Sequence, residues 1–291
     1  MNIFYIITRF NLRLWPHDKR GNQTQTEEWL KERFRLFESY CLPSIAGQTS
    51  KDFTWIVLFD SETPEEYTSR FGRYKLLCPQ FTPVMVQPKV SRKFKTFIPQ
   101  IVTEDIKKRY DNCESFRLIT TYLDNDDALR NDYVAETARL AGEVGNNTFI
   151  SYVKGLQYYT ELNIAVSFRY KTNHFISFVE TIENTSNTIK TVYGFGSHDD
   201  IDKFGNCQCL YLDNQNPKWL EVVHTNNIDN DIRLKFRFSL VTDLLCLKPF
   251  GIDNVLSKQS RKIFYTKFVV RSYKELIRHI RYKIYGRNWW K

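Results

Sequence analysis

Two continuous apolar runs near the N-terminus constrain the fold of this chain more than any other feature. Asn2 to Ile7 and Phe53 to Phe59 are apolar almost throughout, which is typical of strands buried on both faces of a parallel or mixed sheet. One apolar stripe at helical spacing lies between them, formed by Leu30, Phe34, Phe37, Cys41 and Ile45. A helix between two buried strands predicts a strand–helix–strand unit with parallel strands and a right-handed crossover.

The ends of this helix and the later elements are also predicted from local patterns. Thr24 and Glu27 have the spacing of a capping box, Pro43 should distort the last turn, and Gly47 is a natural stop. We interpret the basic segment from Lys89 to Lys95, which holds Arg92 and Lys93, as a solvated loop, with phosphate contact as the alternative. Further strands are expected at Phe81 to Val86, Phe149 to Val153, Ala165 to Tyr170 and Phe175 to Val179, and a helix at Leu129 to Val144.

A third apolar run, Phe116 to Leu123, ends abruptly in the carboxylates of Asp124, Asp126 and Asp127. Its β-branched and aromatic residues favour a strand. If the chain stays extended, Asp124 and Asp126 project to the same side and share one small volume, which is unfavourable unless a cation or a proton relieves it. Oxygen ligands suit Mg²⁺ or Mn²⁺ and leave room for phosphate oxygens. The alternative is an acidic turn that caps a helix starting near Asn131.

Other polar clusters offer further candidates. Thr8, Arg9 and Asn11 follow the first strand, where open α/β sheets receive ligands, although a basic residue there is often only solvated. Asp60 closes the second strand and either caps the following segment or binds a base or ribose. A glycine-rich loop carries His198, Asp199 and Asp200, which make either a polar turn or a site with a general base. His224 follows the apolar pair Val222 and Val223, which favours a structural histidine at the edge of a core.

The net charge of +9 is not spread evenly along the 291 residues. Residues 257–291 contain eleven Lys or Arg and one acid, Glu275, which gives +10, and the other 31 basic and 32 acidic residues sum to −1. The neutral body argues against nucleic acid as the primary partner. In residues 273–291, a basic amphipathic helix ending in Trp289 and Trp290 would either lie on an anionic membrane or pack on the body.

Composition also limits the compartment and the kind of site. The apolar fraction of 42% supports a sizeable core, and no stretch approaches the roughly 20 apolar residues that span a bilayer. We therefore expect a cytoplasmic protein, with the inner face of the membrane as the place for any contact by the tail. The six cysteines are scattered, so neither a zinc site nor a disulfide framework is predicted.

The order of these pieces resembles a known family. The matching stretches are TRFNL (Thr8 to Leu12), WLKERFRLFESYCLPSIAGQT (Trp29 to Thr49), FTWIVLFDSETP (Phe53 to Pro64), TTYLDNDDAL (Thr120 to Leu129) and WLEVVHTNN (Trp219 to Asn227). In these stretches, over roughly residues 1–235, the chain is similar to the bacterial family of putative rhamnosyltransferases, and more distantly to GT-A nucleotide-sugar glycosyltransferases. The resemblance implies an α/β fold, GT-A-like and Rossmann-like, with a mixed, largely parallel sheet between helices. We expect this domain to cover residues 1–240, followed by a basic helical extension at 241–291.

The resemblance also implies roles for individual residues. Donor contacts would come from Thr8, Arg9 and Asn11 at the nucleoside, from Asp60 near the base, and from Asp124 and Asn125 at the ribose or sugar. The divalent cation, Mn²⁺ or Mg²⁺, would be held by Asp126, with Asp127 and His224 as further ligands. Inverting members need a carboxylate base on the acceptor side, and no Glu-Asp pair is found there; Asp199 and Asp200 are the candidates, with His198 as a third.

These observations together predict a metal-assisted glycosyltransferase. The donor would be a nucleoside diphosphate sugar, with rhamnose as one candidate sugar, and the acceptor a glycan or lipid-linked hydroxyl. The competing function is a non-catalytic protein that binds sugar nucleotides, nucleic acid or a membrane surface. An EF-hand is excluded because Ala128 and Leu129 occupy positions that need an oxygen ligand and a glycine. A glycoside hydrolase is excluded because its two carboxylates must flank a sugar ring.

Overall fold

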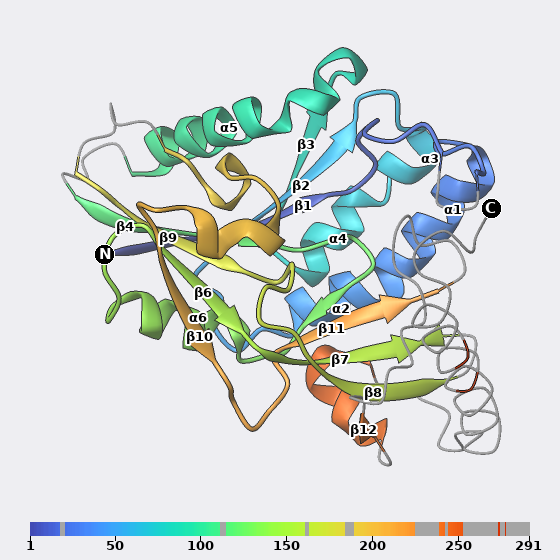
Figure 1. The fold of residues 1–291 in the computed structure, drawn as a ribbon. Coiled ribbons are helices and arrows are strands. Elements are labelled where there is room, and N and C mark those ends of the chain that lie inside the picture. The colour runs from blue at the N-terminus through green and yellow to red at the C-terminus, as the bar shows by residue number, and fades with distance from the viewer. Residues whose placement is uncertain are drawn as a thin grey trace.

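The computed structural model describes residues 1–17, 21–110, 115–160, 163–183, 189–224, 239–241 and 244–252, together with residues 273 and 277. It has a mixed α/β fold in which a seven-stranded sheet lies between helices and a five-stranded sheet lies beside it (Figure 1). The predicted fold class, a mixed and largely parallel sheet between helices, is confirmed.

The large sheet has the order β10-β6-β9-β4-β1-β2-β3. Its strands are β1 (Asn2–Arg9), β2 (Thr54–Asp60), β3 (Phe81–Val86), β4 (Phe116–Tyr122), β6 (Thr148–Tyr152), β9 (Ser177–Ile182) and β10 (Gln208–Leu212). All neighbouring pairs are parallel except those of β9, which runs antiparallel to β4 and β6. The start of β9 therefore lies beside the end of β4, where Thr121 is paired with Ser177.

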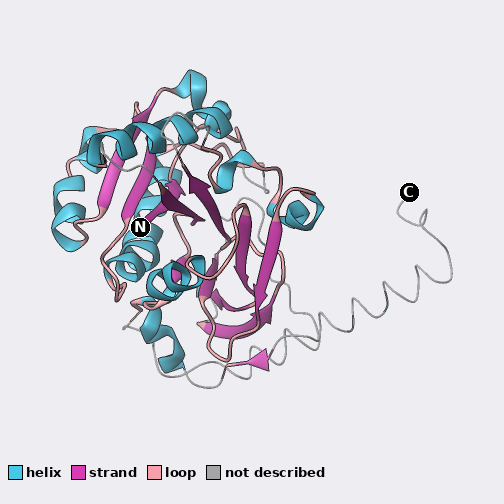
Figure 2. Cartoon of the chain, turned by 90° about the vertical axis from the view of Figure 1, so that its left-hand side faces the viewer, coloured by secondary structure: helices cyan, strands magenta, loops and turns pink. Residues whose placement is uncertain are grey.

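Helices cover both faces of this sheet, because its central strands are apolar on both sides (Figure 2). One face packs against α1 (Glu27–Leu36), the π-helical turn η1 (Phe37–Cys41), α2 (Leu42–Ala46), α3 (Glu65–Thr68), α4 (Phe71–Leu77) and α6 (Tyr133–Ala141). The other face packs against α5 (Phe94–Arg109), η4 (Val192–Gly194) and η5 (His198–Lys203), with η2 (Pro88–Lys93) leading into α5.

The smaller sheet has the order β12-β8-β7-β11-β5. Its strands are β5 (Ala128–Leu129), β7 (Lys154–Tyr159), β8 (Ile164–Arg169), β11 (Trp219–Val223) and β12 (Ser239–Leu240), and the 3-10 helix η6 (Leu244–Phe250) packs on it. Because β5 follows the acidic stretch directly and pairs with β11, the aspartates lie where the two sheets meet. His224, the residue after β11, is brought to the same place.

Several local predictions are wrong. The first helix is capped by Thr26, whose side chain accepts a hydrogen bond from the Trp29 amide, and not by Thr24. The irregularity expected from Pro43 is present one turn earlier than predicted, at η1, because proline lacks the N–H that would bond to a carbonyl of that turn. The helix expected from Leu129 begins only at Tyr133, because Ala128 and Leu129 pair with β11. The segment expected to be a basic loop forms η2 and the start of α5.

No helix among the described residues is long and apolar enough to cross a membrane. Most of the expected basic C-terminal extension lies outside the described residues. The boundary at residue 240 and the amphipathic character of residues 273–291 therefore stay predictions.

Candidate active site

The acidic stretch forms a tight turn instead of extending β4. The chain leaves the strand after Tyr122, and the Asp127 amide lies 3.4 Å from the Asp124 carbonyl oxygen. The expected extended geometry, with Asp124 and Asp126 side by side, is therefore wrong: the turn groups Asp124 with Asp127 and directs Asp126 elsewhere. The capping alternative is also wrong, since α6 starts after Asp132.

Asp126 is buried and paired with a cation of the protein itself. Its Oδ2 atom lies 2.7 Å from a guanidinium nitrogen of Arg33 on α1 and 2.9 Å from Nε2 of His224. Burial favours the neutral acid, but the charge of Arg33 and the hydrogen bond with His224 outweigh it and lower the pKa of Asp126. Asp126 is therefore a charged carboxylate whose charge is compensated within the protein.

Asp127 is also buried, and it faces an imidazole instead of a guanidinium. Its Oδ1 atom accepts a hydrogen bond of 2.8 Å from the Val222 amide, and its Oδ2 atom lies 2.9 Å from Nε2 of His174. Burial, together with the nearby charge of Asp126, raises the pKa of Asp127 despite the hydrogen bond with His174. Burial alone would lower the pKa of His174, but the hydrogen bond and charge of Asp127 raise it. The pair thus retains a proton at neutral pH.

Asp124, Asp127 and His174 each offer one ligand atom, and these three atoms lie within 4.8 Å of one another. Two carboxylates and an imidazole make an oxygen and nitrogen donor set that suits Mn²⁺, and Mg²⁺ with more water ligands. A cation here would take the place of the proton that Asp127 and His174 retain. The residues present therefore fit a divalent ion. The histidine of this group is His174, whereas the sequence predicted His224 as the histidine ligand.

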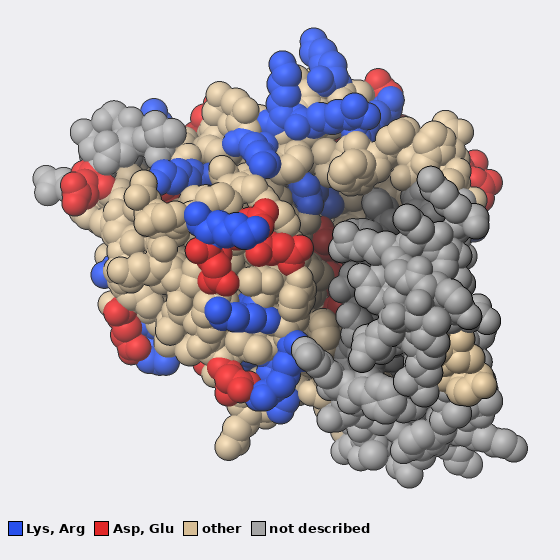
Figure 3. All heavy atoms as spheres, in the orientation of Figure 1, with Lys and Arg blue, Asp and Glu red and all other residues tan. Residues whose placement is uncertain are grey.

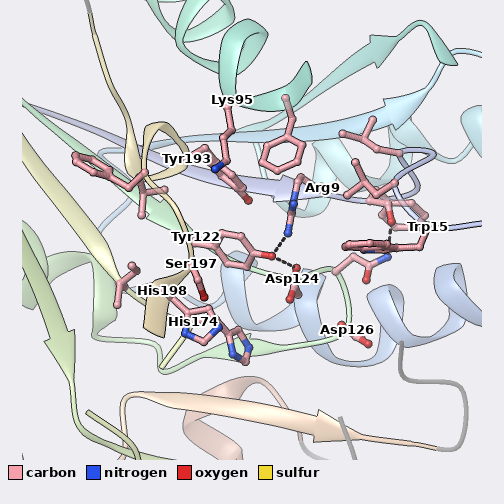
Figure 4. A pocket seen from close by; sticks show the side chains of 18 of the residues that line it. Arg9, Trp15, Lys95, Tyr122, Asp124, Asp126, His174, Tyr193, Ser197 and His198 are labelled. Atoms are coloured by element: carbon pink, nitrogen blue, oxygen red, sulfur yellow. Dashed lines mark hydrogen bonds between the residues drawn. The ribbon is translucent and has the colours of Figure 1, made fainter. Parts of the chain in front are cut away.

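Asp124 and His174 border a cavity of about 510 Å³ at the carboxyl ends of β1 and β4 (Figure 4). Its polar lining includes Arg9, Gln25, Arg33, Lys95, Tyr122, Asp124, Asn125, Asp126, His174, Ser197 and His198. Burial raises the pKa of Tyr122, so its hydroxyl stays protonated and donates to Asp124 Oδ1 at 2.8 Å. The same hydroxyl accepts from Arg9, which connects the end of β1 to the acidic turn.

The three candidate bases occupy different environments. His198 lines the cavity, and its Nδ1 atom lies 2.6 Å from the Thr172 carbonyl oxygen. Because a carbonyl only accepts, Nδ1 carries a proton, and Nε2 is the nitrogen that can take up another. Asp199 and Asp200 are not among the residues that line the cavity. Asp199 accepts from Tyr170, and Asp200 pairs with Lys203 at 2.6 Å on the surface.

Of the residues predicted to contact the donor, Arg9, Asp124 and Asn125 line this cavity, and Thr8, Asn11 and Asp60 do not. Thr8 is buried and accepts from Trp55 Nε1 at 3.0 Å. Asn11 accepts from the Asp60 amide at 2.9 Å and lines, with Asp60, a second cavity of about 400 Å³. Asn125 is buried and donates to the Phe10 carbonyl oxygen at 3.0 Å.

Sequence reasoning missed Arg33, Tyr122 and His174. Arg33 lies on α1 between two residues of the apolar stripe, where a basic residue reads as solvated. His174 precedes the apolar run of β9, so its position beside Asp127 depends on the antiparallel pairing of β9 with β4. The sequence gives one signal for His174, namely that it is a polar residue next to a predicted strand. This signal does not identify Asp127 as its partner.

The chain is thus an α/β protein with a cavity at the carboxyl ends of parallel strands, the edge at which open sheets of this kind receive ligands. The sequence model of the family described as "Putative rhamnosyl transferase" matches residues 7–235. The chain belongs to this family.

Two further comparisons add little. No curated protein matches the chain. Among solved structures, a chain of the inositol-1-phosphate CTP transferase from T. maritima is similar at 13% sequence identity and a TM-score of 0.32, over 77% of this chain and 90% of that one. At this level of similarity the match carries no argument about function.

Proposed function

We propose that the protein transfers a sugar from a nucleoside diphosphate donor to an acceptor hydroxyl, with rhamnose as one candidate sugar. Membership in a transferase family supports the reaction class. The observation that carries the proposal is the cluster of Asp124, Asp127 and His174 beside the large cavity. A diphosphate leaving group gathers negative charge in the transition state, and such a cluster suits the cation that accompanies it.

The first requirement of this reaction is charge compensation at the diphosphate. Asp124, Asp127 and His174 would hold Mn²⁺ or Mg²⁺, which supplies Lewis-acid stabilisation of the leaving group when bound. Asp126 and His224, expected from sequence as ligands, lie beside this cluster. We assign Asp126 to holding the turn in place, because Arg33 already compensates its charge.

The second requirement is removal of the acceptor proton. We propose His198 as the general base, because it lines the cavity and its Nε2 atom is the basic nitrogen. The acceptor oxygen would form a bond to the anomeric carbon as the bond to the diphosphate breaks, and the hydroxyl proton would pass to His198. Direct displacement of this kind inverts the configuration at the anomeric carbon.

A candidate platform for the nucleoside of the donor lies at the end of the cavity opposite His198. Trp15 is 61% exposed and borders the cavity, and Trp29 lines it from α1. An exposed indole there can stack on a nucleobase. This orientation leaves the sugar and the acceptor, a glycan or a lipid-linked hydroxyl, on the side of His198.

The test is release of nucleoside diphosphate from a panel of nucleoside diphosphate sugars, measured with and without Mn²⁺ and with simple glycosides as acceptors. We expect one donor to be consumed in a Mn²⁺-dependent reaction that Asp124→Asn abolishes while the variant stays folded. Binding of a donor without any release would favour the competing function, a non-catalytic sugar-nucleotide-binding protein. Turnover that is equal in wild type and Asp124→Asn would refute the role of the cluster.

A further inference from the structure

Arg9, the last residue of β1, is enclosed by aromatic rings at the edge of the large cavity. The central carbon of its guanidinium lies 4.7 Å from the ring centroid of Phe94, 5.0 Å from that of Tyr122 and 5.3 Å from that of Tyr193. One of its terminal nitrogens donates to the Tyr122 hydroxyl. The rings hold the guanidinium in one orientation and exclude water from its faces.

No carboxylate pairs directly with Arg9 within the described part of the chain. Arg9 forms no ion pair there, and its Nε atom is buried without a hydrogen-bond partner. The nearest compensation is indirect, through the Tyr122 hydroxyl to Asp124. Arg9 is half-buried, and a buried N–H donor without a partner is costly, so a bound anion that accepts from it would remove that cost.

A second cation borders the same side of the cavity. Lys95, in the first turn of α5, is exposed, lines the cavity and forms no ion pair with the residues that the structure describes. In Figure 4, Lys95 and Arg9 come from above the cavity, and Asp124 lies below them. Basic side chains also gather over the segment that connects β3 to α5, where Lys89, Arg92 and Lys93 are exposed (Figure 3).

We propose that Arg9 and Lys95 form an anion subsite that binds the diphosphate of the donor. This inference rests on the proposed function and specifies how the donor is held. The diphosphate would lie between two positive groups: the cation at Asp124, Asp127 and His174 on one side, and the two basic side chains on the other. The hydrogen bonds from Arg9 to Tyr122 and from Tyr122 to Asp124 fix the spacing of the two sides.

Inorganic pyrophosphate is a suitable probe, because it has the charge of the diphosphate but neither nucleoside nor sugar. Titration calorimetry with EDTA present removes the contribution of any divalent cation. We expect wild type to bind pyrophosphate more tightly than orthophosphate, and Arg9→Gln and Lys95→Gln each to weaken pyrophosphate binding about tenfold, as loss of a charged hydrogen bond predicts. Arg92→Gln is the matched control, an exposed basic residue that does not line the cavity, and should bind as wild type.

Unchanged pyrophosphate affinity in both variants would overturn the subsite, and so would an equal loss in Arg92→Gln. Equal affinity for orthophosphate and pyrophosphate would assign the site to a single phosphate and contradict the proposal. If Arg9→Gln does not fold, as judged by circular dichroism, Lys95→Gln at its exposed position decides. The proposed function is tested separately: absence of sugar transfer with intact pyrophosphate binding refutes the reaction, whereas transfer with unaltered affinity in the variants refutes the subsite alone.

Discussion

The Nε2 atom of His174 lies 2.9 Å from Oδ2 of Asp127, although the two residues are 47 positions apart. Antiparallel pairing of β9 with β4 makes this contact, because it places the start of one strand beside the end of the other. The contact completes a group of three possible ligands with Asp124. The contact also raises the pKa of His174, from which we expect metal binding to depend on pH.

We predict that Mn²⁺ binding releases a proton. Burial raises the pKa of Asp127. The hydrogen bond between Asp127 and His174 raises the pKa of His174, so the pair holds a proton at neutral pH. A metal ligand must be deprotonated, and the affinity for Mn²⁺ should therefore rise with pH above neutrality and fall below it. Calorimetry in two buffers of different ionisation enthalpy measures the number of protons released. Proton uptake, or affinity independent of pH, would contradict this account.

His198→Gln should lower kcat by about 10² to 10⁴, the usual contribution of a general base, while donor binding stays intact. Asp200→Asn serves as the control, since Asp200 pairs with Lys203 outside the cavity and should leave kcat unchanged. A variant at His198 with wild-type kcat would exclude it as the base.

Arg33→Met should destabilise the protein by about 3 to 5 kcal/mol, because it leaves the buried charge of Asp126 without its partner. The pKa of Asp126 is lowered in the folded state, so the pair stabilises the protein above the unfolded pKa of about 4 and this stability is lost as pH falls below it. Urea unfolding measures both effects. In Arg33→Met/Asp126→Asn the loss should be smaller than the sum of the single losses, and strict additivity would refute the coupling.

Gly155→Ala should destabilise the protein by about 1 to 3 kcal/mol, the usual cost of overpacking a core. A Cβ atom at this position in β7 would lie 2.0 Å from the ring of Trp219, which is itself stacked on Phe175. Gly72→Ala is the matched control, since nothing lies within 4 Å of its added Cβ and alanine favours α4 by about 0.5 to 1 kcal/mol. Thermal unfolding should therefore shift in opposite directions for the two variants.

The central strands were predictable because burial on both faces leaves a clear record in sequence. The run from Phe81 to Val86 coincides with β3, and the expected strands at the two earlier apolar runs are found as β1 and β2. In contrast, α5 was missed, since Pro99 lies inside it and its apolar face is weak. The small sheet was not predicted, because β5 has only two residues and exists through its pairing with β11.

The site was predictable only in part, for a related reason. The carboxylates stand out because they end an apolar run, and the sequence located them at the edge of the sheet. Their partners come from elsewhere in the chain: Arg33 from α1 and His174 from the start of β9. A local sequence pattern does not contain such pairings. The sequence therefore could not distinguish Asp126, which pairs with Arg33, from Asp124 and Asp127, which lie near His174.

Binding of Mn²⁺ in the presence of a nucleoside diphosphate tests the central claim most directly. Electron paramagnetic resonance of free Mn²⁺ gives the number of ions bound per chain, with each common nucleoside diphosphate added in turn. We predict one Mn²⁺ bound per wild-type chain with the correct nucleotide, and loss of this binding in Asp124→Asn and in Asp127→Asn. Equal Mn²⁺ binding by wild type and both variants would contradict the account.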